Sequence, residues 1–181
     1  MREPGTEILN VPSAERMQEL GRAIGAAIES SSDGSRPFII ALEGELGAGK
    51  TTLVGGILRA HGVTGPIRSP TYTLIEPYET QRRRLYHIDL YRLVDPGEVE
   101  PLGIRDLLTG DARESGAAVL LIEWPSRAAG ALPGADLGIA IAYPPAGTEG
   151  RAVSLTPHTA SGRDAVRQIV AAIPELRQLS S

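Results

Sequence analysis

The sequence predicts a single α/β domain of three layers, in which helices flank a mixed β-sheet. Short apolar runs alternate with segments of helical periodicity, which favours a sheet with parallel strands and helical crossovers. Some neighbouring runs are separated only by short polar turns, as antiparallel strands are. The 181 residues suit one hydrophobic core, and no linker or internal repeat divides them. We therefore expect one domain over residues 1–181, with its core at about 13–157.

A first helix is expected to begin at Ser13, a suitable capping residue, and to end in the polar segment 30–35. The apolar run 37–43 then predicts a buried strand. Apolar residues recur at helical spacing after position 50, and this second helix is expected to stop near His61. The apolar positions of the two helices are Met17, Leu20, Ile24 and Ile28, then Leu53, Val54, Ile57 and Leu58.

Between that strand and the second helix, residues 44–51 read G-x-x-x-x-G-K-T, the phosphate-binding loop (P-loop). With this composition a chance match is expected in roughly one of six hundred such chains. Glycines let backbone N–H groups surround a phosphate, Lys50 reaches the β- and γ-phosphates, and the Thr51 hydroxyl can bind Mg²⁺. Lys50 is the only lysine among 18 basic residues. The expected loop contacts to a nucleotide are Gly47, Ala48, Gly49, Lys50, Thr51 and Thr52.

The middle of the chain predicts a hairpin, with strands in 68–79 and 85–91 joined by a polar turn. The triple arginine 82–84 is compatible with a phosphate lid or an RNA contact, but charge runs usually face water, so we expect a solvated hairpin tip. Thr71 and Thr73 lie where switch segments follow a P-loop helix, and their hydroxyls can meet a γ-phosphate or metal. A helix is expected to start at Asp95, with a further turn at 104–108.

A second continuous apolar run, 117–122, predicts a central strand that ends at Glu123. Because carboxyl ends of strands face the ligand crevice, Glu123 is a candidate for binding Mg²⁺. Asp89 can orient the attacking water, hold the metal, or be an ordinary carboxylate at the end of a strand. Trp124, the only tryptophan, is either a core or hinge residue or a sensor or partner contact beside the nucleotide. His87 is expected to be a packed strand residue rather than a base.

The C-terminal part predicts strands at 137–143 and 151–155 and a last helix, about 161–172, capped by Ser161. The sequence has no cysteine, no signal-peptide pattern and no apolar run near the ~20 residues of a membrane span. We therefore expect a soluble, cytoplasmic protein without a membrane partner. A net charge of −4 argues against a free-standing nucleic-acid binder.

Five blocks, in order and spacing, resemble the TsaE (YjeE) family, the bacterial P-loop ATPases of tRNA threonylcarbamoyladenosine biosynthesis. They are GELGAGKTT at 44–52, SPTYTLIEPY at 69–78, YHIDLYRL at 86–93, GIRD at 103–106 and LIEWP at 121–125. The resemblance runs from about residue 13 to 155, and the last helix matches poorly. It implies a P-loop NTPase fold and Mg²⁺-dependent ATP hydrolysis that supports the TsaB–TsaD pair. TsaD transfers threonylcarbamoyl to the tRNA adenosine next to the anticodon, so tRNA is expected to be an indirect partner.

Carried onto this chain, the resemblance implies that Lys50 binds phosphate and that Thr51 and Glu123 bind Mg²⁺. It also implies that Asp89 lies at the γ-phosphate side. It makes Trp124 functionally important. Arg151 is expected to approach the nucleotide. The family often has Asp where Glu45 stands, and Glu or Gln after E-W-P, where this chain has Ser126 and Arg127.

Three other functions compete with this one. A small-molecule kinase would need an acceptor pocket and an arginine-rich lid. A GTPase would need a guanine motif, N-K-x-D, which the single lysine excludes. A nucleotide-gated binding module would keep Lys50 and Thr51 without hydrolysis.

Overall fold

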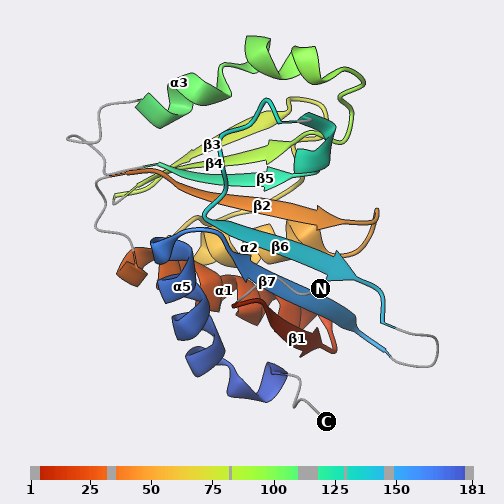
Figure 1. Ribbon diagram of the computed structural model, residues 1–181, viewed down its shortest axis with the longest axis vertical. Coiled ribbons are helices and arrows are strands. Elements are labelled where there is room, and N and C mark those ends of the chain that lie inside the picture. Colours follow the sequence, from red (N-terminus) through yellow and green to blue (C-terminus); the bar gives the residue numbers. More distant parts are fainter. Residues whose placement is uncertain are drawn as a thin grey trace.

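The computed structural model describes residues 5–31, 36–81, 83–109, 118–128, 130–144 and 149–177 and contains a seven-stranded mixed sheet (Figure 1). The strand order is β1-β7-β6-β2-β5-β4-β3, in which β4, β5, β2 and β6 run parallel and the other pairings are antiparallel. The strands are β1 (Glu7–Val11), β2 (Phe38–Gly44), β3 (Ile75–Glu79), β4 (Arg84–Asp89), β5 (Val119–Glu123), β6 (Leu137–Ala142) and β7 (Arg151–Pro157). The mixed sheet confirms the expected α/β class.

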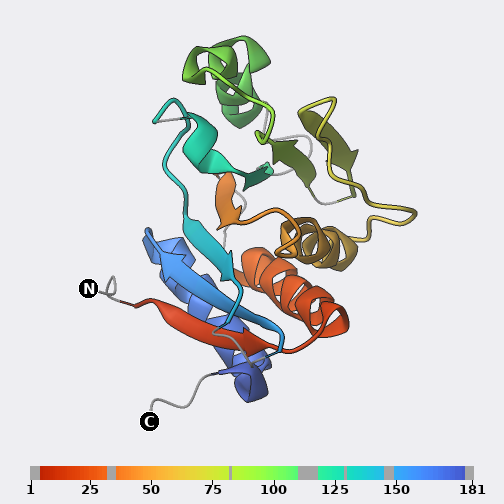
Figure 2. The same cartoon turned by 90° about the vertical axis from the view of Figure 1, so that its right-hand side faces the viewer.

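Helices cover both faces of this sheet, which confirms the expected three layers. The α-helices are α1 (Ala14–Ser31), α2 (Lys50–Ala60), α3 (Ile104–Thr109) and α5 (Ala160–Ala172), and the 3₁₀ helices are η1 (Pro96–Leu102), η2 (Pro125–Ala128) and η3 (Pro174–Leu176). Figure 2 shows α1 beside α2 on one side of the sheet and α3 on the other. The larger apolar core joins α1, α2 and α5 to the sheet, and the smaller joins η1, α3 and η2 to β4 and β5.

Two glycines bring α1 and α2 into close contact. An ideal Cβ at Gly21 would lie 2.3 Å from the carbonyl oxygen of Leu53, and one at Gly56 would lie 2.3 Å from that of Gln18. No side chain fits at either position without moving a helix backbone. The contact therefore fixes α2, whose first residues belong to the P-loop, against the longest helix of the described chain.

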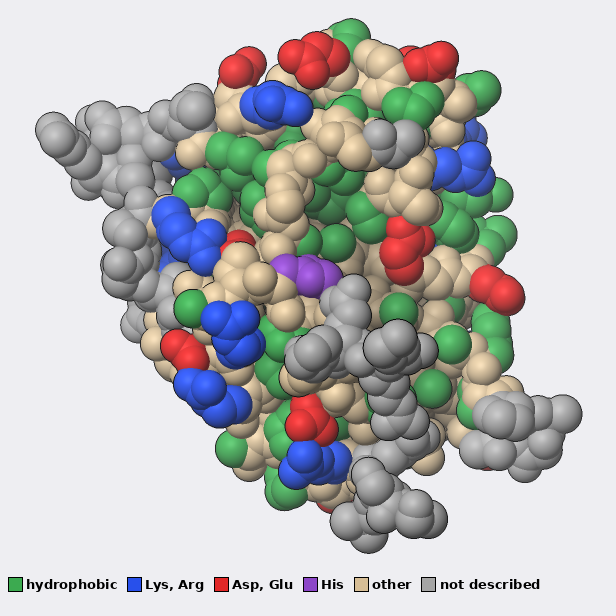
Figure 3. All heavy atoms as spheres, viewed as in Figure 1, with side chains coloured by type: hydrophobic (Ala, Val, Ile, Leu, Met, Phe, Trp, Pro, Cys, Tyr) green, Lys and Arg blue, Asp and Glu red, His purple; other side chains and the backbone are tan. Residues whose placement is uncertain are grey.

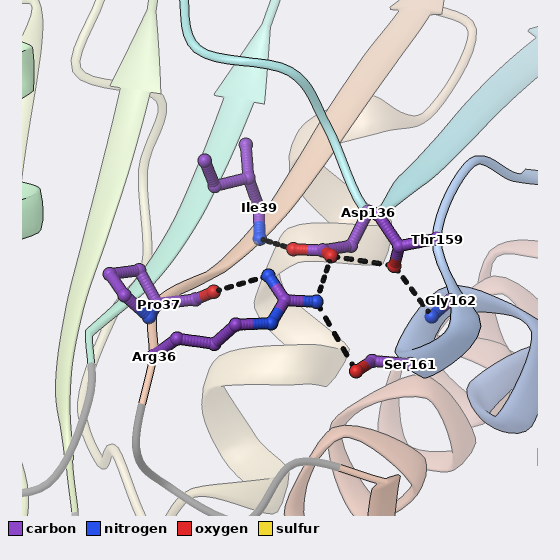
Figure 4. Close-up of polar contacts among 7 residues, drawn as sticks. All are labelled: Arg36, Pro37, Ile39, Asp136, Thr159, Ser161 and Gly162. Atoms are coloured by element: carbon purple, nitrogen blue, oxygen red, sulfur yellow. Dashed lines mark hydrogen bonds and ion pairs between the residues drawn. The ribbon is translucent and has the colours of Figure 1, made fainter.

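Asp136 fastens the amino ends of β2, β6 and α5 together (Figure 4). Its carboxylate is buried and accepts hydrogen bonds from the backbone N–H of Ile39 at 2.9 Å and from the Thr159 hydroxyl at 2.7 Å. Arg36 adds a 2.6 Å ion pair from a half-exposed position. Because the network lies at the opposite ends of β2 and β6 from the P-loop, it stabilises the scaffold rather than the candidate site.

Several expectations about elements need correction. Strand β1 was not predicted from the sequence, and the helix expected from Asp95 is the 3₁₀ helix η1, which contains Pro101. The last helix begins at Ala160 and is capped by Thr159, not Ser161. The central strand is Val119–Glu123, and Ala117 lies outside the described residues.

The expected solvated tip at the triple arginine is wrong for Arg83, although the hairpin itself is confirmed. Arg83 is buried, and its Nε lies 2.9 Å from Glu29 Oε1 on α1. Glu29 also lies 3.1 Å from His61 Nε2, so the hairpin turn is tied to both α1 and the end of α2. Arg82 lies outside the described residues. Within the described ranges, no helix has the length and apolar character needed to cross a membrane.

Candidate functional site

The P-loop connects the carboxyl end of β2 to α2, in the strand–loop–helix order that the motif requires. Gly44, Gly47 and Gly49 have φ values of 150°, 76° and 112°, a region that favours glycine. An ideal Cβ at Gly44 would also lie 2.5 Å from the carbonyl oxygen of Ile141 on the neighbouring strand. These glycines thus permit a backbone conformation that other residues rarely adopt.

Lys50 is the first residue of α2, and its side chain folds back over the loop. Its Nζ donates hydrogen bonds to the carbonyl oxygens of Gly44 at 2.7 Å and Glu45 at 3.0 Å. The same ammonium lies 3.9 Å from the centroid of the Trp124 ring, a cation–π contact. Burial lowers the pKa of Lys50 below its usual value, although the negative charges of Glu123, Asp89 and Glu43 oppose that shift.

Two buried carboxylates stand side by side next to Lys50. Strands β4 and β5 run parallel with Asp89 paired to Glu123, and both residues end their strands. The Thr51 hydroxyl donates to Glu123 Oε1 at 3.0 Å, which links the first turn of α2 to β5. A second contact to the same oxygen comes from His87 Nε2 at 2.8 Å. The hydroxyl and carboxylate oxygens brought together here are donors that Mg²⁺ prefers.

Asp89 holds the segment that follows α2. Its Oδ2 accepts hydrogen bonds from the hydroxyls of Ser69 and Thr71, the latter at 2.9 Å, and Oδ1 accepts from the backbone N–H of Tyr91 at 3.0 Å. Thr73, which shares the expected switch segment, is exposed and does not line this part of the site. Asp89 therefore acts in this structure as the anchor of the 69–71 segment.

Trp124 follows Glu123 in a left-handed conformation, with φ at 59°. Its ring packs against Tyr91 at a centroid distance of 5.1 Å and faces the Lys50 ammonium. Its backbone N–H donates to the carbonyl of Leu42 at 3.0 Å. The side chain thus lies beside the P-loop lysine and packs, partly buried, against the edge of the smaller core.

Two hollows meet at the P-loop. One, of about 300 Å³, is lined by most of the predicted site: Lys50, Thr51, Thr52, Thr71, Asp89, Glu123 and Trp124, with Leu46, Gly47, Gly49, Ser69 and Tyr91. The other, of about 400 Å³, lies between the P-loop, the start of α1 and the start of β7. Gly47, Gly49 and Thr52 line both, so the two hollows adjoin one another at the loop.

Arg151, placed near the nucleotide by sequence reasoning, lines the second hollow and not the first. Its Nε donates to the carbonyl oxygen of Ala48 at 3.2 Å, and its guanidinium stacks on the Tyr143 ring at 4.1 Å. Ser13 and Met17 of the α1 start line the same hollow, a role that sequence reasoning missed. Their signal was hidden because a helix cap and an apolar stripe already accounted for both residues.

Over residues 11–152 the chain matches the family model described as "Threonylcarbamoyl adenosine biosynthesis protein TsaE". The chain belongs to the TsaE family. The "tRNA threonylcarbamoyladenosine biosynthesis protein TsaE" of Haemophilus influenzae is 45% identical over 108 residues, which are 60% of this chain and 65% of that protein. Proteins of the same name from Nostoc sp. and Bacillus subtilis are 42% and 38% identical, over 62% and 65% of this chain and 64% and 68% of their own lengths. The match thus spans about two thirds of each of these relatives.

The fold also has a counterpart among solved structures. The crystal structure of Bacillus subtilis YdiB aligns with a TM-score of 0.66 and 22% identity, over 92% of this chain and 95% of that one. At this identity the likeness speaks for the fold alone, and it supports the predicted three-layer α/β fold.

Proposed function

We propose that this protein is a Mg²⁺-dependent ATPase that serves the biosynthesis of threonylcarbamoyladenosine in tRNA. The observation that carries the proposal is the meeting of Lys50, Thr51, Asp89 and Glu123 around one hollow at the end of a P-loop. Membership of the TsaE family, and the names of its bacterial relatives, support the biosynthetic role.

The residues fit ATP and Mg²⁺. The loop offers backbone N–H groups, and Lys50 lies on its carbonyls, from which the ammonium can turn to β- and γ-phosphate oxygens. Thr51 and Glu123 would hold Mg²⁺ together with phosphate oxygens and water, which is how Mg²⁺ is commonly bound. The ion would neutralise charge that develops during phosphoryl transfer. Asp89 would act at the γ-phosphate side through the hydroxyls of Ser69 and Thr71.

The second hollow is the proposed site for the base and ribose of ATP. It borders the P-loop at Gly47 and Thr52 and is lined by the apolar residues Val11, Pro12 and Met17. A hollow of about 400 Å³ with apolar walls and a few polar groups suits a nucleoside. Arg151, which supports the carbonyl of Ala48, would steady the loop there.

The proposed partners are TsaD and TsaB, and nucleotide-dependent docking to them is the proposed output of the ATPase. The large apolar side chains that the described chain exposes lie at the nucleotide edge: Leu46 within the P-loop, Tyr72 before β3, Tyr91 and Val94 after β4, and Tyr143 after β6. Exposed apolar residues gathered in this way mark interaction sites. A partner that contacts this edge would make different contacts in the ATP and ADP states, as coupling requires.

Contact with tRNA is proposed to be indirect, through those partners. The net charge is −4, and Figure 3 shows acidic side chains interspersed with basic ones on the face that it presents. Affinity for a polyanion depends on phosphates neutralised by basic groups. A filter-binding series at physiological salt tests this, and tight binding of tRNA by the isolated protein would contradict it.

The structure weakens the argument for a small-molecule kinase. The arginine-rich lid of such a kinase would have been the triple arginine, but Arg83 of that run is buried against Glu29 of α1. A kinase lid needs cations that are free to close over phosphates.

Phosphate release from ATP by the isolated protein, then with TsaB and TsaD, then with small-molecule acceptors, tests the proposal. We expect slow hydrolysis alone, faster hydrolysis with the partners, and no dependence on acceptors. Hydrolysis that appears only with an acceptor would favour the kinase, and no hydrolysis in any mixture would favour a binding module.

Calorimetry of partner binding without nucleotide, with ADP and with a non-hydrolysable ATP analogue tests the docking. Partner and ATP should enhance one another by the same factor, in the range of about 5–150-fold. Equal partner affinity in all three states would remove the coupling.

A further inference from the structure

His87 is a polar side chain in the interior of β4 that the proposed reaction does not yet use. It is 0% exposed, and its Nε2 lies 2.8 Å from Oε1 of Glu123 on the neighbouring strand. The alternation of side chains along a strand puts His87 on the same face as Asp89, two residues later. A Leu at this position, like Leu85 two residues earlier, would bury apolar surface without the cost of a buried imidazole.

The hydrogen-bond pattern assigns the ring hydrogen to Nε2. Among the described residues, Nδ1 of His87 is buried and has no hydrogen-bond partner. A hydrogen on Nδ1 would therefore be buried without an acceptor, whereas one on Nε2 points at a carboxylate oxygen. The ring is thus best satisfied as a donor to Glu123.

Both contacts to the Glu123 carboxylate fall on the same oxygen. Oε1 accepts from Thr51 Oγ1 at 3.0 Å and from His87 Nε2 at 2.8 Å, while no hydrogen bond from the described residues reaches Oε2. One oxygen is therefore held from two sides, by α2 and by β4, and the other remains for a cation.

We propose that His87 is a positioning residue for the Mg²⁺ site, which fixes Glu123 Oε1 so that Oε2 is presented to the cation. The inference rests on the proposed function, because it presumes that Glu123 binds the metal. It predicts that the donor at His87 governs Mg²⁺ affinity, since outer partners of metal ligands typically contribute 10–100-fold to metal affinity.

The first test needs no nucleotide and no metal. Long-range ¹H–¹⁵N spectra of the histidine rings report which nitrogen carries the hydrogen, and comparison with H87Q assigns the signals of His87 among the three histidines. We expect the Nε2–H form. The Nδ1–H form would overturn the inference, because the ring could not then donate to Glu123.

The second test compares two substitutions at this position. His87→Gln keeps a donor near the place of Nε2, whereas His87→Leu fills the space with an apolar side chain. Trp124 fluorescence gives the Mg²⁺ concentration at which ATP binding is half-maximal. We expect His87→Leu to raise it about 10–100-fold and His87→Gln to leave it within about threefold of the parent. His158→Leu, at an exposed histidine, is the matched control and should have no effect.

The outcomes separate this inference from the proposed function. A folded His87→Leu protein with unchanged Mg²⁺ dependence would show that His87 only packs, while the proposed function stands. If ATP binding by the parent protein does not depend on Mg²⁺, both the inference on His87 and the proposed function are refuted. If circular dichroism shows that His87→Leu does not fold, the ring spectra and the His87→Gln variant decide.

Discussion

Glu123→Gln is the substitution that most directly tests the proposed chemistry. Glutamine has nearly the same shape, and its amide oxygen can still accept the hydrogen bonds from Thr51 at 3.0 Å and His87 at 2.8 Å. The fold and the place of the side chain should therefore be kept. What is lost is one negative charge at the proposed Mg²⁺ site.

At saturating Mg²⁺ that loss should appear in the rate and not in ATP affinity, although the Mg²⁺ concentration needed for ATP binding should rise at least as much as in His87→Leu. Electrostatic groups that act on the charge of a transition state are worth about 10²–10³ in rate, or about 2.7–4 kcal/mol. ATP affinity should stay within about threefold, because Lys50 and the loop backbone carry most of the phosphate contacts. Single-turnover hydrolysis, measured with protein in excess over ATP, isolates the chemical step.

Glu45→Gln is the matched control for this experiment. It removes the same charge from an exposed position within the P-loop, and we expect a rate within about twofold of the parent. If Glu123→Gln hydrolyses ATP as fast as the parent, the reasoning is refuted and the metal role passes to Asp89. If instead it no longer binds ATP, Glu123 contributes to ground-state binding.

Three further predictions concern Lys50 and the scaffold. Lys50→Ala should abolish binding of a fluorescent ATP analogue, and unchanged affinity would refute the site. Burial lowers the pKa of Lys50, so its ammonium loses the proton at a lower pH than an ordinary lysine does. ATP affinity should therefore fall as the pH rises toward about 10. An ATP affinity that stays constant over this range, or that falls equally in the Lys50→Arg control, would contradict this. Asp136→Ala leaves the Ile39 N–H and the Thr159 hydroxyl without their carboxylate acceptor and should cost about 1–3 kcal/mol, a fall of roughly 5 °C in melting temperature. The exposed ion pair of Asp164 with Arg167 is its control, and Asp164→Ala should cost less than about 1 kcal/mol; equal losses would contradict the burial argument.

The parts of this protein that could be predicted from sequence are those whose signal is local. The P-loop is a contiguous motif, and the apolar runs before it and before Glu123 are long enough to indicate buried strands. The rule that ligands bind at carboxyl ends of strands then placed Asp89 and Glu123 at one edge. The register that pairs them bears out this placement.

The features that sequence reasoning missed depend on partners far away in the chain. Arg83 is buried because Glu29, more than fifty positions earlier, meets it from α1. Thr159 caps the last helix instead of Ser161 because its hydroxyl also reaches Asp136. Both are suitable caps, so local propensity could not choose between them. Strand β1 is five residues long at the edge of the sheet and contains Glu7 and Asn10, so its pattern alone is weak.

Local backbone preference is broken at two places, and both adjoin the candidate site. Among the described residues other than glycine, only Leu74 and Trp124 have positive φ, at 63° and 59°. Such a conformation costs about 1–2 kcal/mol for an ordinary side chain. Leu74 ends the segment that Asp89 anchors, and its carbonyl accepts from the Asp89 N–H at 2.9 Å.

Trp124 is held in the same kind of conformation from both of its sides. Its own N–H bonds to Leu42 of β2, and the Ser126 N–H bonds to Glu43 Oε1 at 2.7 Å. Parallel strands β2 and β5 therefore over-determine the turn that places the indole against Lys50. Strain that persists only because its surroundings enforce it is a feature of binding and switch segments. The two strained residues flank the γ-phosphate side that we propose for Asp89. We therefore expect segments 69–74 and 124–126 to change conformation first when ATP is replaced by ADP.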